Sequence, residues 1–557
     1  MLDPEALARS IVYAGSMEAW APVFARLDSG EPLVLGVFGA SVAQNGGCLD
    51  QPYKRCIRYD GLHSTFMRWG EPRIRPFKGF AVRLLDHINA TYPNRRHRIN
   101  NSALDATPAQ NALPCLFSHL PTTLHVVILE FGSMAFHLHL RAIETAARML
   151  LSLNPRPLLI FLSMHEWCQR HKDRPRSLYV PGERLRGGYI YPDTPWARTE
   201  AEATRVCERY GQACLSVHKA LDPNVRRGLP GFGLNDVVGE DCLHPTHGVH
   251  GVEYVSAILR HAFDQARLRM KAARSSSPPA AAAHTTQLPP PLYPENDNVG
   301  ARKARCYGFV RAADYRKAFG QSSMYRALQP IEWLSVTCNQ PGEWIRPVTE
   351  PALTLRHYSA KAGAISYGTA GGLPCAKPAQ PAHCPRGGFG TSKKAATVLR
   401  HFLRSPPRTW FWCYSSLATN PANQKKSPGA LALVPGATLH FPIDARMSST
   451  GSAPGPTSGV LASSRDAVEV HIEHLTSYEN MGIVNLRCVG GCSCAMQRID
   501  AHRTDAHRNV SVFLQHAFRL AGANAGTCAL QLQVQPETSS GGYKFKVRTV
   551  TIVEVAR

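Results

Sequence analysis

Residues 33–43 read LVLGVFGASVA, an apolar run that ends at a serine flanked by small residues. A run with no polar member before the serine predicts a strand that is buried on both faces, as the strands of parallel sheets are. Ser41 follows that strand directly. A serine on such a turn is a candidate nucleophile, and its small neighbours leave room for a carbonyl group to approach.

Similar apolar runs alternate with helical patterns through the first half of the chain. Strands are expected at 33–38, 123–131 and 158–164, and helices at 80–89 and 141–153. Beyond Pro245, apolar residues recur at helical spacing and predict a closing helix; they are Val249, Val252, Val255, Leu259, Ala262 and Phe263. This order predicts a three-layer, flavodoxin-like α/β domain over residues 1–270, in which a doubly wound parallel sheet carries its site at the carboxyl ends of the strands.

The second half of the chain has a different pattern. Residues 275–291, SSSPPAAAAHTTQLPPP, offer no amphipathic face and several helix breakers, so a linker is expected over 271–300. Apolar and polar residues then alternate in runs that predict half-buried antiparallel strands, at 467–474, 528–534 and 543–553. Loops rich in Pro, Gly and Ser separate such runs, notably at 374–388 and 450–459. The prediction for 301–557 is a cysteine-rich β-sandwich of jelly-roll type that serves as an accessory domain.

The composition narrows the classes of protein that fit. A chain of 557 residues is long enough for two or more domains, and it holds no run of about eighteen apolar residues, so no transmembrane helix is expected. The net charge of +23 favours contact with polyanions. Basic residues are scattered, however, and the densest group, at 95–98, lacks interleaved aromatic residues, so we expect a solvated basic surface and no specific nucleic-acid partner.

Sixteen cysteines, with a dense cluster at Cys488, Cys492 and Cys494, indicate disulfides and an oxidising compartment. A zinc site formed by this cluster with His502 and His507 is the alternative. Three glycosylation acceptor patterns, at 89–91, 100–102 and 509–511, agree with a secretory or extracellular route, although the charged first residues do not read as a signal peptide.

Two other groups of histidines carry weaker metal signals. His244, His247 and His250 recur every third residue, but Pro245 and nearby glycines argue against a regular helix there. His165-Glu166 lacks the second histidine of a metalloprotease helix. No metal and no cofactor is expected.

Residues 241–245 read DCLHP and place a carboxylate and an imidazole three residues apart. That spacing suits a general base, His244, and an acid that orients it, Asp241. Together with Ser41, these residue types are the parts of a nucleophilic hydrolase.

The ordered motifs resemble the blocks of the SGNH hydrolase family, the GDSL-like esterases and lipases, over about residues 30–265. Residues 39–42 (GASV) look like the first block, which holds the nucleophile, and 101–107 (NSALDAT) look like the second, whose backbone helps to form the oxyanion hole. Residues 130–135 (EFGSMA) stand where the third block would be, and 241–245 look like the fifth.

The resemblance implies a role for each residue. Ser41 would attack the carbonyl carbon, His244 would take its proton, and Asp241 would hold the imidazole ring. The backbone amides of Ser41 and Ala106 would bind the oxyanion.

Two positions depart from the family pattern. Ala106 replaces a glycine, which leaves the backbone donor in place, and Met134 replaces an asparagine that donates from its side chain. Loss of one such donor typically lowers the rate about a hundredfold to a thousandfold. Ser133 is the candidate substitute.

The implied activity is serine esterase action through an acyl-enzyme at Ser41, without a metal. The favoured substrate is a carbohydrate that carries an O-acetyl or other O-acyl group, because the family includes carbohydrate acetylesterases and a basic surface suits an acidic glycan; lipid esters stay open. The alternative is a catalytically silent glycan-binding or cell-surface protein, which Met134 suggests.

Overall fold

The computed structural model divides into two compact units, and the boundary between them lies between Ala301 and Arg302. The residues it describes are 2–46, 54–56, 66–68, 78–104, 106–169, 177–178, 193–239, 242–246, 250–276, 287–297, 299, 304–308, 329–330, 334–336, 410–415, 426–445, 468–504, 511–521 and 527–554. Each unit is described by itself.

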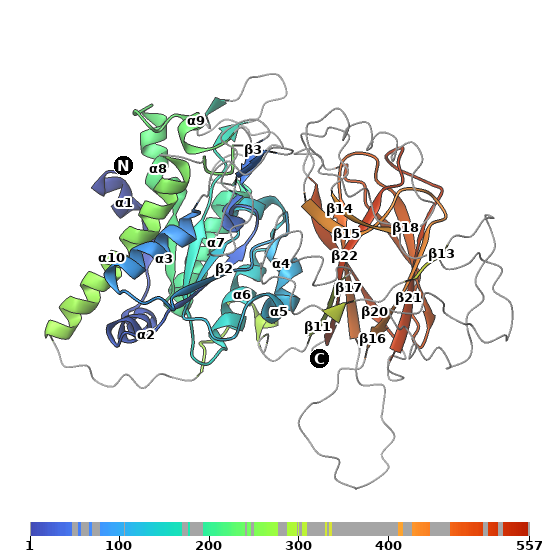
Figure 1. The fold of residues 1–557 in the computed structure, drawn as a ribbon, viewed down its shortest axis with the longest axis horizontal. Coiled ribbons are helices and arrows are strands. Elements are labelled where there is room, and N and C mark those ends of the chain that lie inside the picture. Colours follow the sequence, from blue (N-terminus) through green and yellow to red (C-terminus); the bar gives the residue numbers. More distant parts are fainter. Residues whose placement is uncertain are drawn as a thin grey trace, which may run out of the picture. The chain divides into compact units, whose positions relative to one another are not determined.

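The first unit is built on a six-stranded sheet in the order β1-β10-β7-β6-β2-β5 (Figure 1). Neighbouring strands are parallel, except that β1 is antiparallel to β10. Every residue of β2, β6 and β7 is buried, which explains why these strands read as apolar runs. The strands are β1 Ile11–Ala14, β2 Val34–Gly39, β5 Arg98–Asn101, β6 Val126–Glu130, β7 Leu158–Ser163 and β10 Ala213–Ser216; two small hairpins pair β3 Lys54–Cys56 with β4 Phe66–Arg68, and β8 Cys168–Gln169 with β9 Ser177–Leu178.

The parallel strands follow the flavodoxin-like order, so the predicted α/β fold is confirmed. From β2 the chain passes to β5 on one side, then crosses to β6 on the other, and the direction of winding reverses between β2 and β6. In such sheets ligands bind outside the carboxyl ends of the strands at this reversal. Ser41 follows β2, and residues 131–134 follow β6, so both lie at this point.

Helices cover both faces of the sheet (Figure 1). On one face, α1, α2, α3, α8 and α10 share a single core with Leu35 and Val37 of β2, in which Phe24 packs on Phe263 with ring centroids 5.2 Å apart. On the other, α6 and α7 pack on each other. The helices are α1 Pro4–Ser10, α2 Met17–Asp28, α3 Phe80–Thr91, α4 Ala109–Ala112, α5 Leu116–His119, α6 Arg141–Leu151, α7 Pro195–Tyr210, α8 Val217–Arg226, α9 Leu234–Val237 and α10 Gly251–Ser276.

The second unit consists of two sheets whose described neighbours are antiparallel, apart from the parallel pair β11 and β12 (Figure 1). One sheet contains β11 Ala304–Gly308, β12 Gln329–Pro330, β14 Phe411–Ser415, β15 Lys426–Ala432, β17 Val468–Thr476, β20 Val512–Leu520 and β22 Phe545–Glu554. The other contains β13 Leu334–Val336, β16 Thr438–Asp444, β18 Ile483–Gly490, β19 Gln497–Asp500 and β21 Thr527–Val534.

Two contacts tie the two sheets together. Nε1 of the buried Trp410 donates to the carbonyl oxygen of Ala437 at 3.2 Å, and Arg305 of β11 forms an ion pair of 2.6 Å with Asp444 of β16. The predicted β-sandwich is therefore confirmed, and the alternating runs are β17, β21 and β22. The loops expected at 374–388 and 450–459 lie outside the described residues.

Disulfides occur in both units, as the cysteine content predicts. Cys207 of α7 bonds to Cys214 of β10, and in the sandwich Cys488 bonds to Cys494 and Cys492 to Cys528. The sulfur atoms of Cys488, Cys492 and Cys528 lie within 4.8 Å of one another. Because each belongs to a disulfide, none is a thiolate ligand, and the zinc alternative gains no support. His507 lies outside the described residues, and His502 is not close enough to join the cluster.

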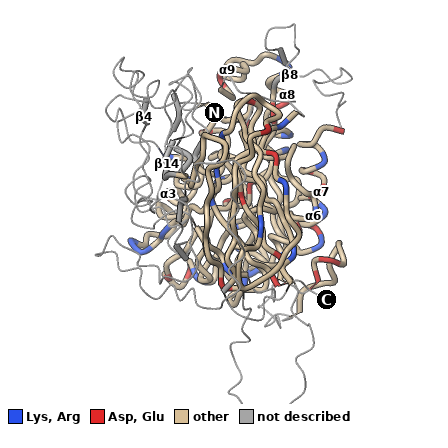
Figure 2. The backbone as a smooth tube through the Cα atoms, turned by 90° about the vertical axis from the view of Figure 1, so that its right-hand side faces the viewer, with Lys and Arg blue, Asp and Glu red and all other residues tan. Residues whose placement is uncertain are grey.

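Lys and Arg positions are scattered along the described chain among Asp and Glu positions, as expected for a solvated basic surface (Figure 2). Many of these charges are paired, for example Arg274 with Asp28 at 2.5 Å. Among the helices of the described residues, none is long and apolar enough to span a membrane.

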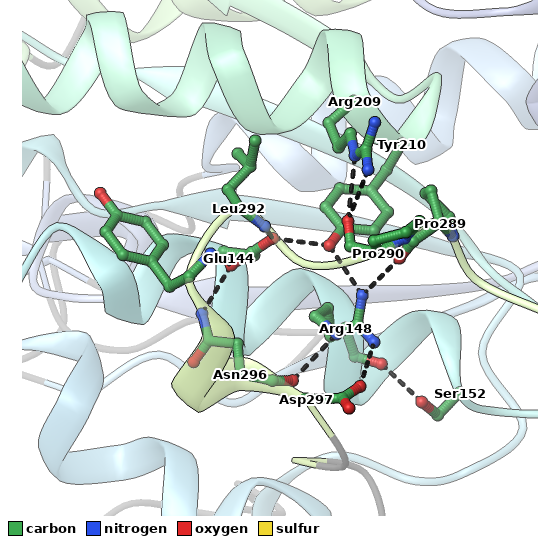
Figure 3. A network of polar contacts seen from close by, with 11 residues as sticks. Glu144, Arg148, Ser152, Arg209, Tyr210, Pro289, Pro290, Leu292, Asn296 and Asp297 are labelled. Atoms are coloured by element: carbon green, nitrogen blue, oxygen red, sulfur yellow. Dashed lines mark hydrogen bonds and ion pairs between the residues drawn. The ribbon is translucent and has the colours of Figure 1, made fainter.

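Residues 287–297 lie against α6 and α7, where a buried polar network holds them (Figure 3). The carboxylate of Glu144, fully buried on α6, accepts hydrogen bonds at 2.5–3.0 Å from four donors. These are the backbone N–H groups of Leu292 and Tyr293, Nδ2 of Asn296 and the hydroxyl of Tyr210.

Arg148, one turn after Glu144 on α6, completes this network. Its guanidinium donates to the carbonyl oxygens of Pro289 and Asn296 at 2.7 and 3.0 Å (Figure 3). The segment expected as a linker is thus structured in two of its parts. Residues 287–297 are held by this network, and α10 runs to Ser276. The sequence hides this because backbone groups, which carry no residue signal, make most of the contacts.

We expect Glu144→Ala to release residues 287–297 from α6. The substitution leaves buried donors without an acceptor, and each such group costs about 1–3 kcal/mol. Hydrogen exchange measures the effect, because the amides of Leu292 and Tyr293 should lose their protection. Glu208→Ala, at an exposed position on α7, is the matched control. Unchanged protection of both amides in the Glu144 variant would contradict the assignment.

Candidate active site

Ser41 and His244 meet at the carboxyl edge of the first sheet. Nε2 of His244 lies 2.7 Å from Oγ of Ser41, although the two residues are 203 positions apart in the chain. Both side chains are partly exposed, so a substrate can reach them. The distance is that of a hydrogen bond between a nucleophile and its general base.

The turn that carries Ser41 depends on a close approach between two strand ends. Gly39, the last residue of β2, is in register with Glu130, the last residue of β6. A Cβ atom at Gly39 would overlap the carbonyl oxygen of Glu130 and the methyl group of Ala43. After Ser41 the chain enters a short π-helical turn, Val42–Gly46. Glycine at position 39 therefore allows the nucleophile turn to sit directly on the end of β6.

The segment that follows β5 braces the same turn. The backbone N–H groups of Ser102 and Leu104 each donate to β2, to the carbonyl oxygens of Val37 and Gly39, at 2.9 Å. Side chains add two further bonds, from Asn101 to the carbonyl oxygen of Ala43 at 3.1 Å and from Gln44 to that of Ala103 at 3.0 Å. The second sequence block thus runs alongside the turn that carries Ser41, and its role in an oxyanion hole stays a prediction.

Ala106 has a left-handed backbone conformation, with φ of +50°. Glycine adopts this region freely, whereas a residue with a Cβ is strained there. The position at which the family pattern has glycine is therefore a position that favours glycine in this chain also. Its amide N–H is a backbone donor whichever residue is present.

The loop with His244 is held by backbone hydrogen bonds on both sides. Gly239 N–H donates to the carbonyl oxygen of His244 at 2.9 Å, and Thr246 N–H donates to that of Val237 at 3.0 Å. Cys242, a disulfide cysteine, has a positive φ of +64° and accepts from the backbone N–H of Trp167 at 2.8 Å. These hydrogen bonds hold the loop between α9 and α10 against the segment that follows β7.

Asp241, the predicted orienting acid, lies outside the described residues, and so does His247. Among the described residues, metal-ligating side chains gather closely only at the disulfide cysteines of the sandwich. His165, at the exit of β7, is buried, and burial lowers its pKa well below the usual range of histidine. Its ring packs against that of His218, with centroids 4.1 Å apart.

Ser133, the expected substitute oxyanion donor, makes a different bond. Its hydroxyl donates to Oε2 of Glu130 at 2.8 Å, and its backbone N–H donates to Oε1 at 2.7 Å. A hydroxyl has one hydrogen to donate, and here it is bonded to Glu130, so the role of Ser133 as a substitute oxyanion donor stays a prediction. Met134 beside it is buried.

Glu130 is the residue at this site that sequence reasoning missed. Its side chain has no exposed surface. The sequence does contain a signal for a buried carboxylate here, because Glu130 is a charged residue at the end of a run that is otherwise typical of a fully buried strand. Burial raises the pKa of its carboxyl group, while hydrogen bonds from Ser133 and the positive charge of His244 act in the opposite direction.

No family model matches this chain, and no curated protein matches it in sequence. Among solved structures, it is similar to a two-domain esterase (CEX) active on acetylated mannans and co-crystallized with mannopentaose, at 11% identity over 99% of each chain and a TM-score of 0.47. It is also similar to Axe2, an acetylxylan esterase from Geobacillus stearothermophilus, at 15% identity over 42% of this chain and 93% of that one, with a TM-score of 0.26. At these scores the likeness carries no inference about function.

We expect Ala106→Gly to stabilise the first unit and to keep its activity. The left-handed conformation costs alanine about 1–2 kcal/mol, and the greater freedom of glycine in the unfolded chain offsets about 0.4–1 kcal/mol of that gain. The net change is therefore about 0–1.6 kcal/mol in favour of glycine.

Ala201→Gly, on the exposed face of α7, is the matched control, and it should destabilise by about 1 kcal/mol. Urea unfolding of the full chain measures both changes. A loss of stability at position 106 equal to that at position 201 would show that the strain at Ala106 is not real.

Proposed function

We propose that this protein is a serine ester hydrolase in which Ser41 is the nucleophile and His244 the general base. The observation that carries the proposal is the 2.7 Å contact between Oγ of Ser41 and Nε2 of His244 at the carboxyl edge of the sheet. Partial exposure of both residues and the small neighbours of Ser41 support it.

The reaction follows from this pair. Oγ of Ser41 attacks the carbonyl carbon of the ester while His244 takes the hydroxyl proton, and the backbone amides of Ser41 and Ala106 bind the oxyanion that forms. The intermediate collapses as His244 returns the proton to the leaving alcohol, which leaves an acyl group on Ser41. Water then attacks the acyl-enzyme by the same route. Asp241 would orient the imidazole ring.

The substrate class in this proposal is a carbohydrate that carries an O-acetyl or other O-acyl group. The resemblance of the sequence blocks to a family that includes carbohydrate acetylesterases supports it. Basic and acidic positions are interspersed (Figure 2), so charge alone does not select one glycan, and acetylated mannan and acetylated xylan are both suitable probes. The disulfides of both units support a secretory or extracellular location, because such bonds persist in oxidising compartments.

We expect a fluorophosphonate probe to label the wild-type protein at Ser41 and to leave Ser41→Ala unlabelled. Hydrolysis of p-nitrophenyl acetate should fall by about four orders of magnitude or more in Ser41→Ala and in His244→Gln, because the two residues act as one unit. Ser29→Ala, at an exposed serine, is the control and should label fully. A wild-type protein that is not labelled would favour the silent glycan-binding alternative.

Met134→Asn tests the missing oxyanion donor. A side-chain amide at this position should raise kcat, by up to about a hundredfold, because one such donor is typically worth that much. Met134→Leu keeps the apolar volume without a donor and should leave kcat near the wild-type value. The measurement is kcat for p-nitrophenyl acetate on folded protein. Equal kcat values for the Asn and Leu variants would exclude a donor position there.

A further inference from the structure

Thr246 is a buried residue that lies two positions after His244. Its polar groups bond to the two helices on either side of the His244 loop. The backbone N–H donates to the carbonyl oxygen of Val237 at 3.0 Å, and the hydroxyl donates to that of Asp236, so both bonds end on α9. The carbonyl oxygen of Thr246 accepts from the backbone N–H of Val252 on α10 at 2.9 Å. The backbone and the side chain of Thr246 thus join α9 to α10.

The start of α10 packs closely on Thr246. A Cβ atom at Gly251, the first residue of α10, would overlap the backbone nitrogen, the carbonyl oxygen and the hydroxyl of Thr246. One turn into the helix, the hydroxyl of Tyr254 donates to the carbonyl oxygen of Gly231 at 2.8 Å, and its ring stacks on that of Phe232. Thr246 therefore lies at a junction where α10 is also tied to the segment before α9.

A stiff piece of chain connects Thr246 to His244. Pro245 stands between them, and a proline ring fixes φ at about −65° and restricts the backbone of the residue before it. The same piece is paired with the chain after α9, through an antiparallel bridge between Val238 and Pro245. The N–H of Gly239 adds a bond to the carbonyl oxygen of His244 at 2.9 Å. A displacement of Thr246 is therefore passed on to His244.

The contact of His244 with Ser41 tolerates little displacement. Nε2 and Oγ are 2.7 Å apart, and a shift of about 1 Å takes the two atoms beyond hydrogen-bond range. A misplacement of that size can lower the rate of an enzyme about a hundredfold. The position of the loop backbone is thus a condition for the proposed proton transfer.

We propose that Thr246 is a positioning residue whose hydroxyl fixes the His244 loop between α9 and α10 and so holds the imidazole at Ser41. It touches no reacting atom and acts through the backbone of Pro245 and His244. The inference rests on the proposed esterase function.

Removal of the hydroxyl tests this role. Thr246→Val keeps the shape of the side chain and takes away the donor to the carbonyl oxygen of Asp236. We expect kcat for p-nitrophenyl acetate to fall about tenfold or more while KM stays within about twofold, because a displaced His244 slows the chemical step and leaves the substrate contacts in place. Thr246→Ser keeps the hydroxyl and should have nearly the wild-type kcat.

Thr199→Val is the matched control. Thr199 is buried on α7, and its hydroxyl donates to the carbonyl oxygen of Pro195 at 2.8 Å, so the same substitution removes the same kind of bond away from the His244 loop. Both Val variants should lose stability toward urea, and kcat should fall in Thr246→Val alone. Equal kcat values in the two Val variants, or a Ser variant as slow as Thr246→Val, would overturn the proposal.

A second variant displaces Thr246 and keeps its hydroxyl. Gly251→Ala puts a methyl group against the backbone of Thr246, so kcat should fall here too, with KM near the wild-type value. This variant tests the role even if Thr246→Val does not fold. Wild-type kcat in folded Gly251→Ala would contradict the proposal.

Hydrogen exchange separates failure of this inference from failure of the proposed function, because it needs no turnover. The amides of Gly239 and Thr246 should exchange faster in Thr246→Val than in the wild type or in Thr199→Val. If the wild type is inactive, the esterase proposal fails, yet faster exchange of these amides would still support the loop role. If the wild type is active and Thr246→Val matches it in exchange and in kcat, the inference fails alone.

Discussion

The contact between the ends of β2 and β6 is the constraint on which the site depends. Gly39 lies against the carbonyl oxygen of Glu130, so closely that no side chain fits at position 39. This contact occurs where the winding of the sheet reverses, which is the point at which ligands bind in sheets of this kind. The turn with Ser41 begins there, and residues 101–104 and the loop of His244 are bonded to the same framework. A buried backbone contact thus sets the position of the partly exposed Ser41.

Much of the fold could be predicted, because buried parallel strands have no polar face. The runs that became β2, β6 and β7 are apolar throughout or nearly so. In the sandwich, residues 528–534 of β21 alternate between buried and half-buried as predicted, whereas residues 545–552 of β22 are all buried. The strand β5 was missed because it is an edge strand, RINN, with an exposed first residue. Residues 287–297 were missed because their contacts use backbone groups and one asparagine, which no periodic pattern reveals.

At the site too, the sequence reveals residues by their type and order, and it does not reveal features that depend on backbone geometry. Ser41 and His244 could be proposed from residue types and their order, and the structure places them 2.7 Å apart. The left-handed conformation of Ala106 could not be read from an alanine, since alanine gives no sign of it. Glu130 was read as part of a motif rather than as a buried charge, because burial depends on the register of β6 against β2. Asp241 stays a prediction, since it lies outside the described residues.

Met134 and Ser133 stand where a side-chain donor to the oxyanion is expected, and neither side chain is available as that donor in this structure. Attack on an ester creates an oxyanion and an imidazolium together, and stabilising either charge lowers the barrier. Met134 cannot donate to the oxyanion, and Ser133 uses its hydroxyl on Glu130. In the proposed mechanism the oxyanion is therefore bound by the backbone amides of Ser41 and Ala106. The position of the Ser41 amide depends on the close contact between Gly39 and Glu130, since Ser41 follows Gly39 by two residues. The proposed chemistry thus relies on backbone groups that the strand contact holds in place, rather than on a side-chain donor.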